Sequence, residues 1–264
     1  MQVSLIVTTY NWPFALDAVL QSIRRQTVLP LEVIVADDGS GHDTRLLIEN
    51  NAQNYPVPLK HSWQIDEGFR LARSRNLAIA LAQGEYIIII DGDMVLDSRF
   101  IEDHIGAAKA GCYVQGTRMI TKAEFNLAEF MQKGKKLHFF SRHISKRSRT
   151  LRLPLLSKLI LKISEGKKTN SVKGCNQAYW RKDLLALNGF DERFIGWGRE
   201  DRDLMLRAIR MGLKRRELRF SGLAAHIYHN ERRPIGDNPN DRWINENTER
   251  RITKCLHGLD QHQS

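Results

Sequence analysis

The stretch Tyr86-Ile87-Ile88-Ile89-Ile90-Asp91-Gly92-Asp93 decides the fold class of this chain. Its unbroken run of apolar side chains predicts a strand that is buried on both faces, as in a parallel sheet. Similar runs occupy residues 3–8 and 31–36, and helical patterns lie around residues 16–23, 44–50 and 71–81. Strands that alternate with helices predict a largely parallel sheet with helices on both faces, which is an α/β fold.

Two carboxylates follow this strand directly. Asp91 and Asp93 stand two residues apart, and Gly92 between them allows a close backbone approach. Ligands bind at the carboxyl ends of the strands in such sheets, so a ligand is expected here. Hard oxygen ligands suit Mg²⁺ or Mn²⁺, which would also bind the phosphates of a substrate. An isolated Asp-x-Asp is otherwise a solvated turn.

The turn Asp37-Asp38-Gly39-Ser40 follows the predicted strand at residues 31–36. A carboxylate at this place could accept a hydrogen bond from the imide N–H of a uracil or from the hydroxyls of a ribose. The alternative is a turn or a helix cap, which the same residue types favour. The sequence leaves both interpretations open.

Two later segments carry further candidate groups. Gly196-Trp197-Gly198-Arg199-Glu200-Asp201-Arg202-Asp203 places glycines around a tryptophan and carboxylates in a predicted first helical turn. These carboxylates either stabilise the helix dipole or supply a general base beside a ring that stacks on a sugar. His226-Ile227-Tyr228-His229 offers two imidazoles three residues apart. They are either metal ligands or ordinary surface and core histidines.

The composition is globular, and the positive charge is concentrated in one segment. The 264 residues carry a net charge of +11, and residues 131–170 hold twelve basic residues and one acidic residue. Such a block indicates an anionic partner or a solvated segment. No apolar run is long enough to span a bilayer, and the N-terminus lacks a secretory signal pattern. Three widely spaced cysteines exclude a disulfide framework and suit a reducing cytoplasm.

Taken together and in this order, the motifs resemble those of glycosyltransferase family 2, whose members have the GT-A fold. The resemblance covers residues 3–230. The nucleotide-binding half of the family is matched by Val7-Thr8-Thr9-Tyr10-Asn11, Asp37-Asp38-Gly39-Ser40, Arg75-Asn76, Gly84-Glu85-Tyr86 and Asp91-Gly92-Asp93. The acceptor half of galactosyltransferase-like and chondroitin-polymerase-like members is matched by Gly189-Phe190-Asp191-Glu192 and Gly196-Trp197-Gly198-Arg199-Glu200-Asp201.

The resemblance implies inverting transfer of a sugar from a nucleotide diphosphate donor, usually UDP-linked, with Mn²⁺ or Mg²⁺ as cofactor. It assigns nucleotide-sugar binding to Thr8, Tyr10, Asp37, Asp38, Asp66, Arg75, Asp91 and Gly92. It makes Asp201 the catalytic base. Glu200, the second catalytic residue, would bind the acceptor. Contacts to the acceptor sugars fall to Asn176, Trp197 and Gly198, and the metal ligands would be Asp91, Asp93, His226 and His229.

We expect one continuous GT-A domain in three parts. Residues 1–120 form the nucleotide-sugar-binding half, residues 121–172 a basic insert, and residues 173–264 the acceptor-binding half with a C-terminal tail. The insert matches no family motif. Within it, apolar residues recur at helical spacing beside Lys158 and Lys162; they are Leu155, Leu156, Leu159, Ile160 and Ile163.

The pattern in the insert is typical of a helix that lies in a lipid interface. A core helix with solvated charges gives the same pattern. The first interpretation predicts an anionic membrane surface as a partner and a peripheral enzyme on the inner face of the cytoplasmic membrane. Its pathway would be the synthesis of bacterial lipopolysaccharide or another surface polysaccharide.

Two other functions fit part of the sequence. A nucleotidyltransferase also uses strand-end carboxylates and a metal, but it has no use for the segment at residues 196–201. An RNA- or membrane-binding module could use the basic block, where His138, Phe139 and Phe140 could stack on bases. That module leaves three acidic clusters unexplained. We therefore expect a UDP-sugar donor, a glycan or glycolipid acceptor and no nucleic-acid partner.

Overall fold

A computed structural model describes residues 1–123, 125, 127, 140–145, 147–167, 174–230 and 236–262. These residues form one sheet of seven strands and a smaller sheet of four. The large sheet consists of β1 (Val3–Thr9), β2 (Glu32–Asp37), β3 (Leu59–Trp63), β4 (Tyr86–Asp91), β6 (Cys112–Gln115), β9 (Asn176–Trp180) and β10 (Lys214–Glu217). The small sheet consists of β5 (Met94–Leu96), β7 (Met119–Thr121), β8 (Ile144–Ser145) and β11 (Ala224–His226).

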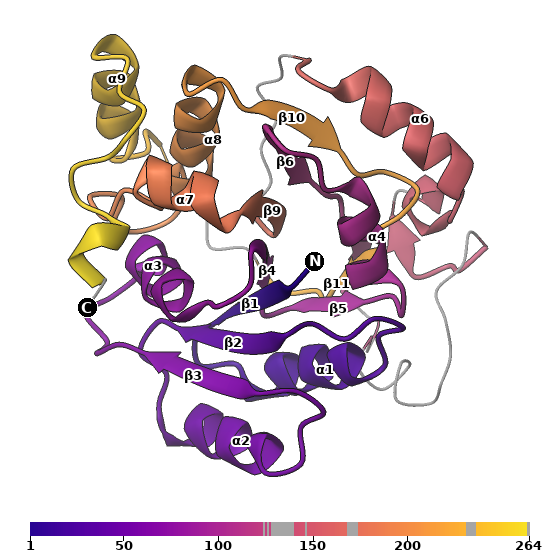
Figure 1. Cartoon of the computed structure of the whole chain (residues 1–264). Helices are drawn as coiled ribbons and strands as arrows, with labels where there is room; N and C mark the ends of the chain where they lie inside the picture. Colours follow the sequence, from indigo (N-terminus) through magenta and orange to yellow (C-terminus); the bar gives the residue numbers. More distant parts are fainter. Residues whose placement is uncertain are drawn as a thin grey trace.

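Helices surround the large sheet (Figure 1). They are α1 (Pro13–Arg24), α2 (His42–Ala52), α3 (Leu71–Leu81), α4 (Phe100–Ala107), α6 (Pro154–Ser164), α7 (Arg181–Leu187), α8 (Glu200–Arg210) and α9 (Asp241–Glu249). Two 3₁₀ turns, η1 (Arg147–Thr150) and η2 (Leu259–His262), complete the described elements. The strand order is β10-β6-β9-β4-β1-β2-β3 in the large sheet and β5-β11-β7-β8 in the small one.

The alternation of side chains along β4 divides the core into two layers. Ile88 and Ile90 pack in one cluster with residues of α1, α2 and α4. Ile87 and Ile89 face the opposite layer, with residues of α3, α7 and α8. Both faces of the strand are covered, which is why its sequence is continuously apolar. The predicted α/β fold with helices on both faces is confirmed.

Strand β9 was not predicted, because the pattern after Gly174 indicates a turn and then a helix. The structure inserts β9 antiparallel between β4 and β6. Its first residue, Asn176, is buried and satisfied, since Oδ1 lies 2.9 Å from His104 Nε2 and Nδ2 donates to the Thr117 carbonyl at 3.0 Å. A strand with satisfied polar residues gives no apolar run for sequence reasoning to detect.

Strand pairing places the candidate groups at one edge of the large sheet. β1 pairs in parallel with both β2 and β4, so Thr9 lies opposite Asp37 and Thr8 opposite Asp91. β11 pairs with β5, and His226 lies opposite Met94, the residue after Asp93. The sequence of residues 223–228 predicts a strand, and β11 confirms it. This strand brings His226 beside the second aspartate of the motif.

The basic insert lies partly outside the described residues, and so do His138 and Phe139. The helix predicted within it is confirmed as α6, which packs beside β10. In the described part of the chain, no helix has both the length and the apolar character that crossing a membrane requires.

Candidate active site

Asp93 and two histidines form a compact cluster at the carboxyl edge of the sheet. Asp93 Oδ2 lies 3.1 Å from Nε2 of His226 and 3.1 Å from Nε2 of His229. Their potential ligand atoms all lie within 4.8 Å of one another. Among the described residues, the buried Oδ1 of Asp93 has no hydrogen-bond partner. A pocket of about 480 Å³ adjoins the cluster and is lined by Ile120, His226, Tyr228, His229 and Asn230.

The environment of Asp93 favours its charged form. Burial raises the pKa of this carboxyl, but hydrogen bonds from His226 and His229, together with their charges, lower it to about 2. Two imidazoles and an ionised carboxylate with an unused oxygen form a donor set that suits a divalent transition metal better than Mg²⁺, which prefers oxygen ligands alone. The residues present therefore fit a divalent transition-metal ion.

Asp91 lies outside this cluster and pairs with Arg75 instead. Arg75 is 2% exposed, and its Nη2 lies 3.3 Å from Asp91 Oδ1. Its Nη1 lies 3.0 Å from Glu200 Oε1 at the start of α8. The buried guanidinium of Arg75 thus joins Asp91 of the strand-end motif to Glu200, which is predicted to bind the acceptor. Arg75 is thus held by two carboxylates of the protein, and its contact with the nucleotide, which the resemblance implies, stays a prediction.

The two carboxylates that begin α8 lie in different surroundings. Burial and the neighbouring charge of Asp201 raise the pKa of Glu200 to about 7, and Arg75 opposes this shift. Asp201 is less buried, and its Oδ1 accepts the Arg202 N–H at 2.7 Å. A Cβ on Gly174 would stand 3.0 Å from Asp201 Oδ2, so the glycine leaves that oxygen its space.

The turn after β2 uses its first carboxylate internally. Asp37 is fully buried; its Oδ1 accepts the Ser40 N–H at 2.8 Å, and its Oδ2 lies 2.8 Å from His61 Nε2. These contacts stabilise the turn, which is the alternative to ligand binding that the sequence leaves open for Asp37. Asp38 accepts the Arg70 N–H at 2.9 Å and the Gln64 side-chain amide. Burial raises the pKa of Asp38 to about 6.

The remaining predicted nucleotide residues line the same edge. Tyr10 is exposed, and its hydroxyl donates to Asp66 Oδ2 at 2.9 Å. Thr8 is buried, with Oγ1 3.5 Å from Asp91 Oδ1. A Cβ on Gly92 would stand 2.2 Å from the Thr8 carbonyl oxygen, so only glycine fits where the chain crosses the end of β1.

Trp197 stands on a turn of left-handed residues: Gly196, Gly198 and Arg199 have φ of +81°, +89° and +83°. Trp197 itself is 43% exposed. Segments of the C-terminal tail hold the turn. Asn238 donates to the Trp197 carbonyl and Asn240 to the Gly198 carbonyl, both at 2.9 Å. Arg199 Nε donates to Asp241 Oδ1 at 2.6 Å.

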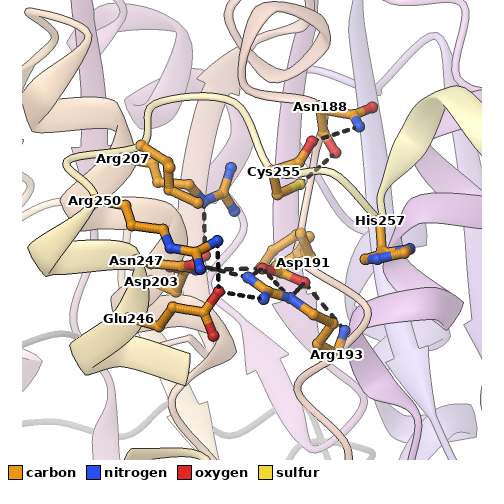
Figure 2. A network of polar contacts seen from close by, with 12 residues as sticks. Asn188, Asp191, Arg193, Asp203, Arg207, Glu246, Asn247, Arg250, Cys255 and His257 are labelled. Carbon is orange, nitrogen blue, oxygen red and sulfur yellow. Dashed lines mark hydrogen bonds and ion pairs between the residues drawn. The ribbon is translucent and has the colours of Figure 1, made fainter. Parts of the chain in front are cut away.

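A buried polar network fixes α8 and the tail to each other (Figure 2). Arg207 is fully buried and donates to Asp203 Oδ2 at 2.6 Å. Asn247 of α9 donates to the other Asp203 oxygen at 2.7 Å and accepts from Arg193 Nη2 at 2.7 Å. Asp203 therefore has a structural role.

The structure brings most of the predicted site residues to one edge of the sheet. There they contact different partners and form several small groups rather than one cluster. Asn176, predicted to touch acceptor sugars, is buried beneath the edge with both polar atoms bonded to protein. Sequence reasoning missed Arg118, whose pKa is raised through the charges of Cys175, Asp91 and Asp93 although burial opposes this. It also missed the supporting residues of the tail, which carry no motif.

A mostly parallel sheet with carboxylates at its ligand edge, facing further carboxylates on a helix, fits the GT-A fold. The chain belongs to glycosyl transferase family 2, whose family model matches residues 4–184. A second model, the N-terminal domain of galactosyltransferase, matches residues 160–230. The predicted family and fold are therefore confirmed.

Known relatives are longer than this chain. A chondroitin synthase of Escherichia coli is 26% identical over 258 residues, covering 92% of this chain and 37% of the relative. The GalNAc(5)-diNAcBac-PP-undecaprenol beta-1,3-glucosyltransferase of Campylobacter jejuni is 31% identical over 137 residues, covering 50% of this chain and 43% of the relative. The chain thus spans less than half of each.

Solved structures share the fold. TarS of S. aureus (residues 1–349), in complex with UDP-GlcNAc, superimposes with a TM-score of 0.62 at 18% identity, covering 92% of this chain and 64% of that one. The mannosyltransferase PcManGT of Pyrobaculum calidifontis, in complex with GDP-Man and Mn²⁺, gives 0.59 at 20% identity, covering 92% and 59%. At these identities the likeness establishes the fold alone.

Proposed function

We propose that this chain transfers a sugar from a UDP-sugar to a hydroxyl of a glycan or glycolipid acceptor, with inversion at the anomeric carbon. The observation that carries the proposal is the Asp93–His226–His229 cluster at the end of the strand-end motif. The other aspartate of that motif, Asp91, is joined through the buried Arg75 to Glu200 at the start of α8. A nucleotidyltransferase would use the metal-binding cluster but would have no use for Glu200 and Asp201. No comparison favours that alternative.

Mn²⁺ would be held by Asp93, His226 and His229, with Asp91 completing the strand-end motif on the nucleotide side. When bound, the ion neutralises the charge that develops on the leaving nucleoside diphosphate. Asp91 itself is oriented by Arg75. Burial raises the pKa of this carboxyl, and the charge of Arg75 opposes the rise. PcManGT, whose complex contains both GDP-Man and Mn²⁺, supports this assignment by analogy.

The nucleotide would lie along the ends of β1, β2 and β3. Tyr10, Asp38 and Asp66 form the polar surface there, and Thr8 and Gly92 shape its boundary with the metal cluster. Residues 1–120 are thus assigned to donor binding and residues 173–264 mainly to the acceptor. TarS, which forms a complex with UDP-GlcNAc, supports a UDP-linked donor.

Asp201 is the proposed base. In the described part of the chain its Oδ2 accepts no hydrogen bond, and Gly174 keeps that side open. Glu200 is tied to Arg75, so it is suited to orient an acceptor hydroxyl rather than to carry its proton away. A positioned base that deprotonates the attacking hydroxyl contributes about 10²–10⁴-fold to such reactions. The exposed Trp197 ring would stack on the acceptor sugar.

The acceptor is proposed to be lipid-linked, as in bacterial lipopolysaccharide or another surface polysaccharide. The Campylobacter jejuni relative carries an undecaprenol-linked acceptor in its name, which supports this class. The site of action would then be the inner face of the cytoplasmic membrane, with the protein attached peripherally.

The test is a screen of UDP- and GDP-sugars for release of free nucleotide in the presence of Mn²⁺, with and without glycolipid acceptors. We expect release with one UDP-sugar, and a product whose anomeric configuration is opposite to that of the donor. The variant Asp201→Asn should bind UDP as the wild type does and lose at least about 100-fold in turnover. Retention of configuration, or a collapse of UDP binding in the variant, would remove Asp201 from the role of base.

A further inference from the structure

Helix α6 presents its apolar side chains to the outside. Leu155, Leu159 and Ile163 recur once per turn and are 83%, 51% and 50% exposed. Leu153 and Leu156 are exposed beside them. The buried side of the helix consists of Ser157, Leu161 and Ser164, of which only one is apolar. The helix is therefore oriented opposite to a core helix, whose apolar stripe faces inward.

Positive charge borders this apolar face and is not balanced locally. Lys158 and Lys162 are exposed on α6 itself, and Arg147 and Lys167 are exposed at its two ends. Residues 147–167 contain one carboxylate, Glu165. Its oxygens lie 2.8 Å from Lys109 Nζ and 3.7 Å from Arg216 Nε, so its charge is already compensated.

We propose that the outward face of α6 docks on the surface of an anionic membrane, with Leu155, Leu159 and Ile163 among the lipid chains and the flanking lysines at the headgroups. The exposed apolar side chains match the lipid chains of that interface, and the lysines beside them match its anionic headgroups. A neutral partner would leave the lysines without counter-charge. A soluble polyanion would leave the leucines in water.

The helix is mounted rigidly, so docking would orient the whole enzyme. At its N-terminal end, Arg152 pairs with Asp103, with Nη2 2.7 Å from Oδ1, and the Leu153 N–H donates to the Phe220 carbonyl at 2.9 Å. At the other end, Ser164 Oγ accepts the Glu217 N–H at 2.8 Å. Substitutions on the outward face leave these contacts intact.

The direction of α6 relates this face to the active site. Its start lies next to Phe220, beyond the end of β10, and Gly166, after its end, donates to Arg215 near the start of β10. α6 therefore runs antiparallel to β10 and begins at the sheet edge that carries Asp91. Arg149 Nη1 of the preceding turn donates to the carbonyl of Arg118 at that edge. This step rests on the proposed function: a lipid-linked acceptor would enter the site from the docked membrane.

The experiment measures co-sedimentation of the intact chain with vesicles of phosphatidylcholine alone or mixed with phosphatidylglycerol, at low and high salt. We expect binding to the anionic vesicles only, with release at high salt. The paired variant Lys158→Gln/Lys162→Gln should bind about thirtyfold more weakly, since each lysine near an anionic surface is worth about fivefold. The variant Leu155→Gln/Leu159→Gln should lose at least about tenfold.

Matched controls separate docking from general changes in charge or hydropathy. Arg45→Gln/Lys254→Gln removes two exposed charges elsewhere, and Leu256→Gln removes a leucine that is 75% exposed outside α6. Both controls should bind vesicles as the wild type does. Nucleotide release from the donor should be unchanged in all these variants, so a failure of the enzymatic proposal is seen separately.

Three results would overturn the proposal. The wild type could ignore anionic vesicles at low salt. The α6 variants could bind as well as the wild type, which would move docking to another surface. Sedimentation equilibrium could show a wild-type dimer that Leu155→Gln/Leu159→Gln converts to a monomer without any vesicle binding, which would assign this face to a second copy of the chain.

Discussion

Asp93 combines burial, a full negative charge and an unused oxygen in one side chain. The two histidines beside it stabilise that charge, which is why the pKa of Asp93 falls to about 2 despite burial. Without a cation the oxygen atom Oδ1 has no hydrogen-bond partner among the described residues. The residue is therefore organised for a ligand rather than for the core.

We expect Asp93→Asn to lose at least about 100-fold in Mn²⁺ affinity, because the amide removes the anionic ligand between two imidazoles. Titration calorimetry measures the affinity, and the thermal unfolding midpoint in the absence of metal checks the fold. Asp43→Asn, an exposed aspartate in the first turn of α2, is the matched control and should bind the ion normally. Unchanged Mn²⁺ affinity in Asp93→Asn would refute the ligand assignment.

Glu200 couples the stability of the fold to pH. Its pKa is raised from 4.5 to about 7, so the folded protein keeps a proton that the unfolded chain releases. This stabilisation is complete below pH 4.5 and is lost as the pH rises through 7. We expect it to amount to about 3 kcal/mol at most. Glu200→Gln should therefore show a flatter dependence of unfolding free energy on pH between 5 and 8.

Urea unfolding at several pH values measures this dependence, with the metal absent. Glu249→Gln, an exposed residue of α9, is the control and should keep the wild-type profile. If wild type and Glu200→Gln lose stability in parallel over this range, the Arg75 bridge holds Glu200 ionised throughout and the proton is not bound.

At the scale of elements, the C-terminal tail acts on the acceptor side. Asn238, Asn240 and Asp241 hold the left-handed turn that carries Trp197 and leads into α8. The glycines adopt positive φ without strain, but Arg199 at φ +83° is strained unless its surroundings fix it. The tail is therefore a positioning element for the proposed acceptor site.

We expect Asn240→Ala and Asp241→Ala to raise KM for the acceptor by about tenfold, because a loosened turn no longer presents the indole in one orientation. The KM for the donor should not change, since the nucleotide residues lie on other elements. Glu249→Ala, at the far end of the same helix, should leave both constants unchanged. A parallel rise in both KM values would indicate a general loss of structure instead.

The elements differ in how well the sequence predicts them, for physical reasons. β1, β2 and β4 each contain an apolar run because both faces of these strands are covered, so their patterns predict strands clearly. β9 and α9 are held in part by satisfied polar groups such as Asn176 and Asn247, which an apolar pattern in the sequence does not reveal. Likewise, motifs identify Asp93, His226 and His229, but the place of Arg75 between Asp91 and Glu200 depends on the packing of α3 against α8.

At the scale of the whole molecule, the proposed metal site joins two sheets. Asp93 follows β4 of the large sheet, whereas His226 ends β11 of the small sheet and His229 lies just beyond it. An ion held by all three residues fixes the small sheet against the edge where the nucleotide would lie. Metal and nucleotide should therefore bind with positive coupling, and such coupling is reciprocal.

We expect saturating Mn²⁺ to tighten UDP binding at least about tenfold, and saturating UDP to tighten Mn²⁺ binding by the same factor. Ligands that bind only the folded state also stabilise it, by about 2.7 kcal/mol at a concentration of 100 Kd, so the thermal midpoint should rise most when both are present. Chelation should reverse the gain. Asp93→Asn should abolish the coupling but keep the weak, metal-free affinity for UDP, because its nucleotide surface at Tyr10, Asp38 and Asp66 is unchanged. If the wild type binds UDP with the same affinity in Mn²⁺ and in chelator, the cluster of Asp93, His226 and His229 does not take part in donor binding. The cluster would then bind a ligand other than the metal ion of the donor.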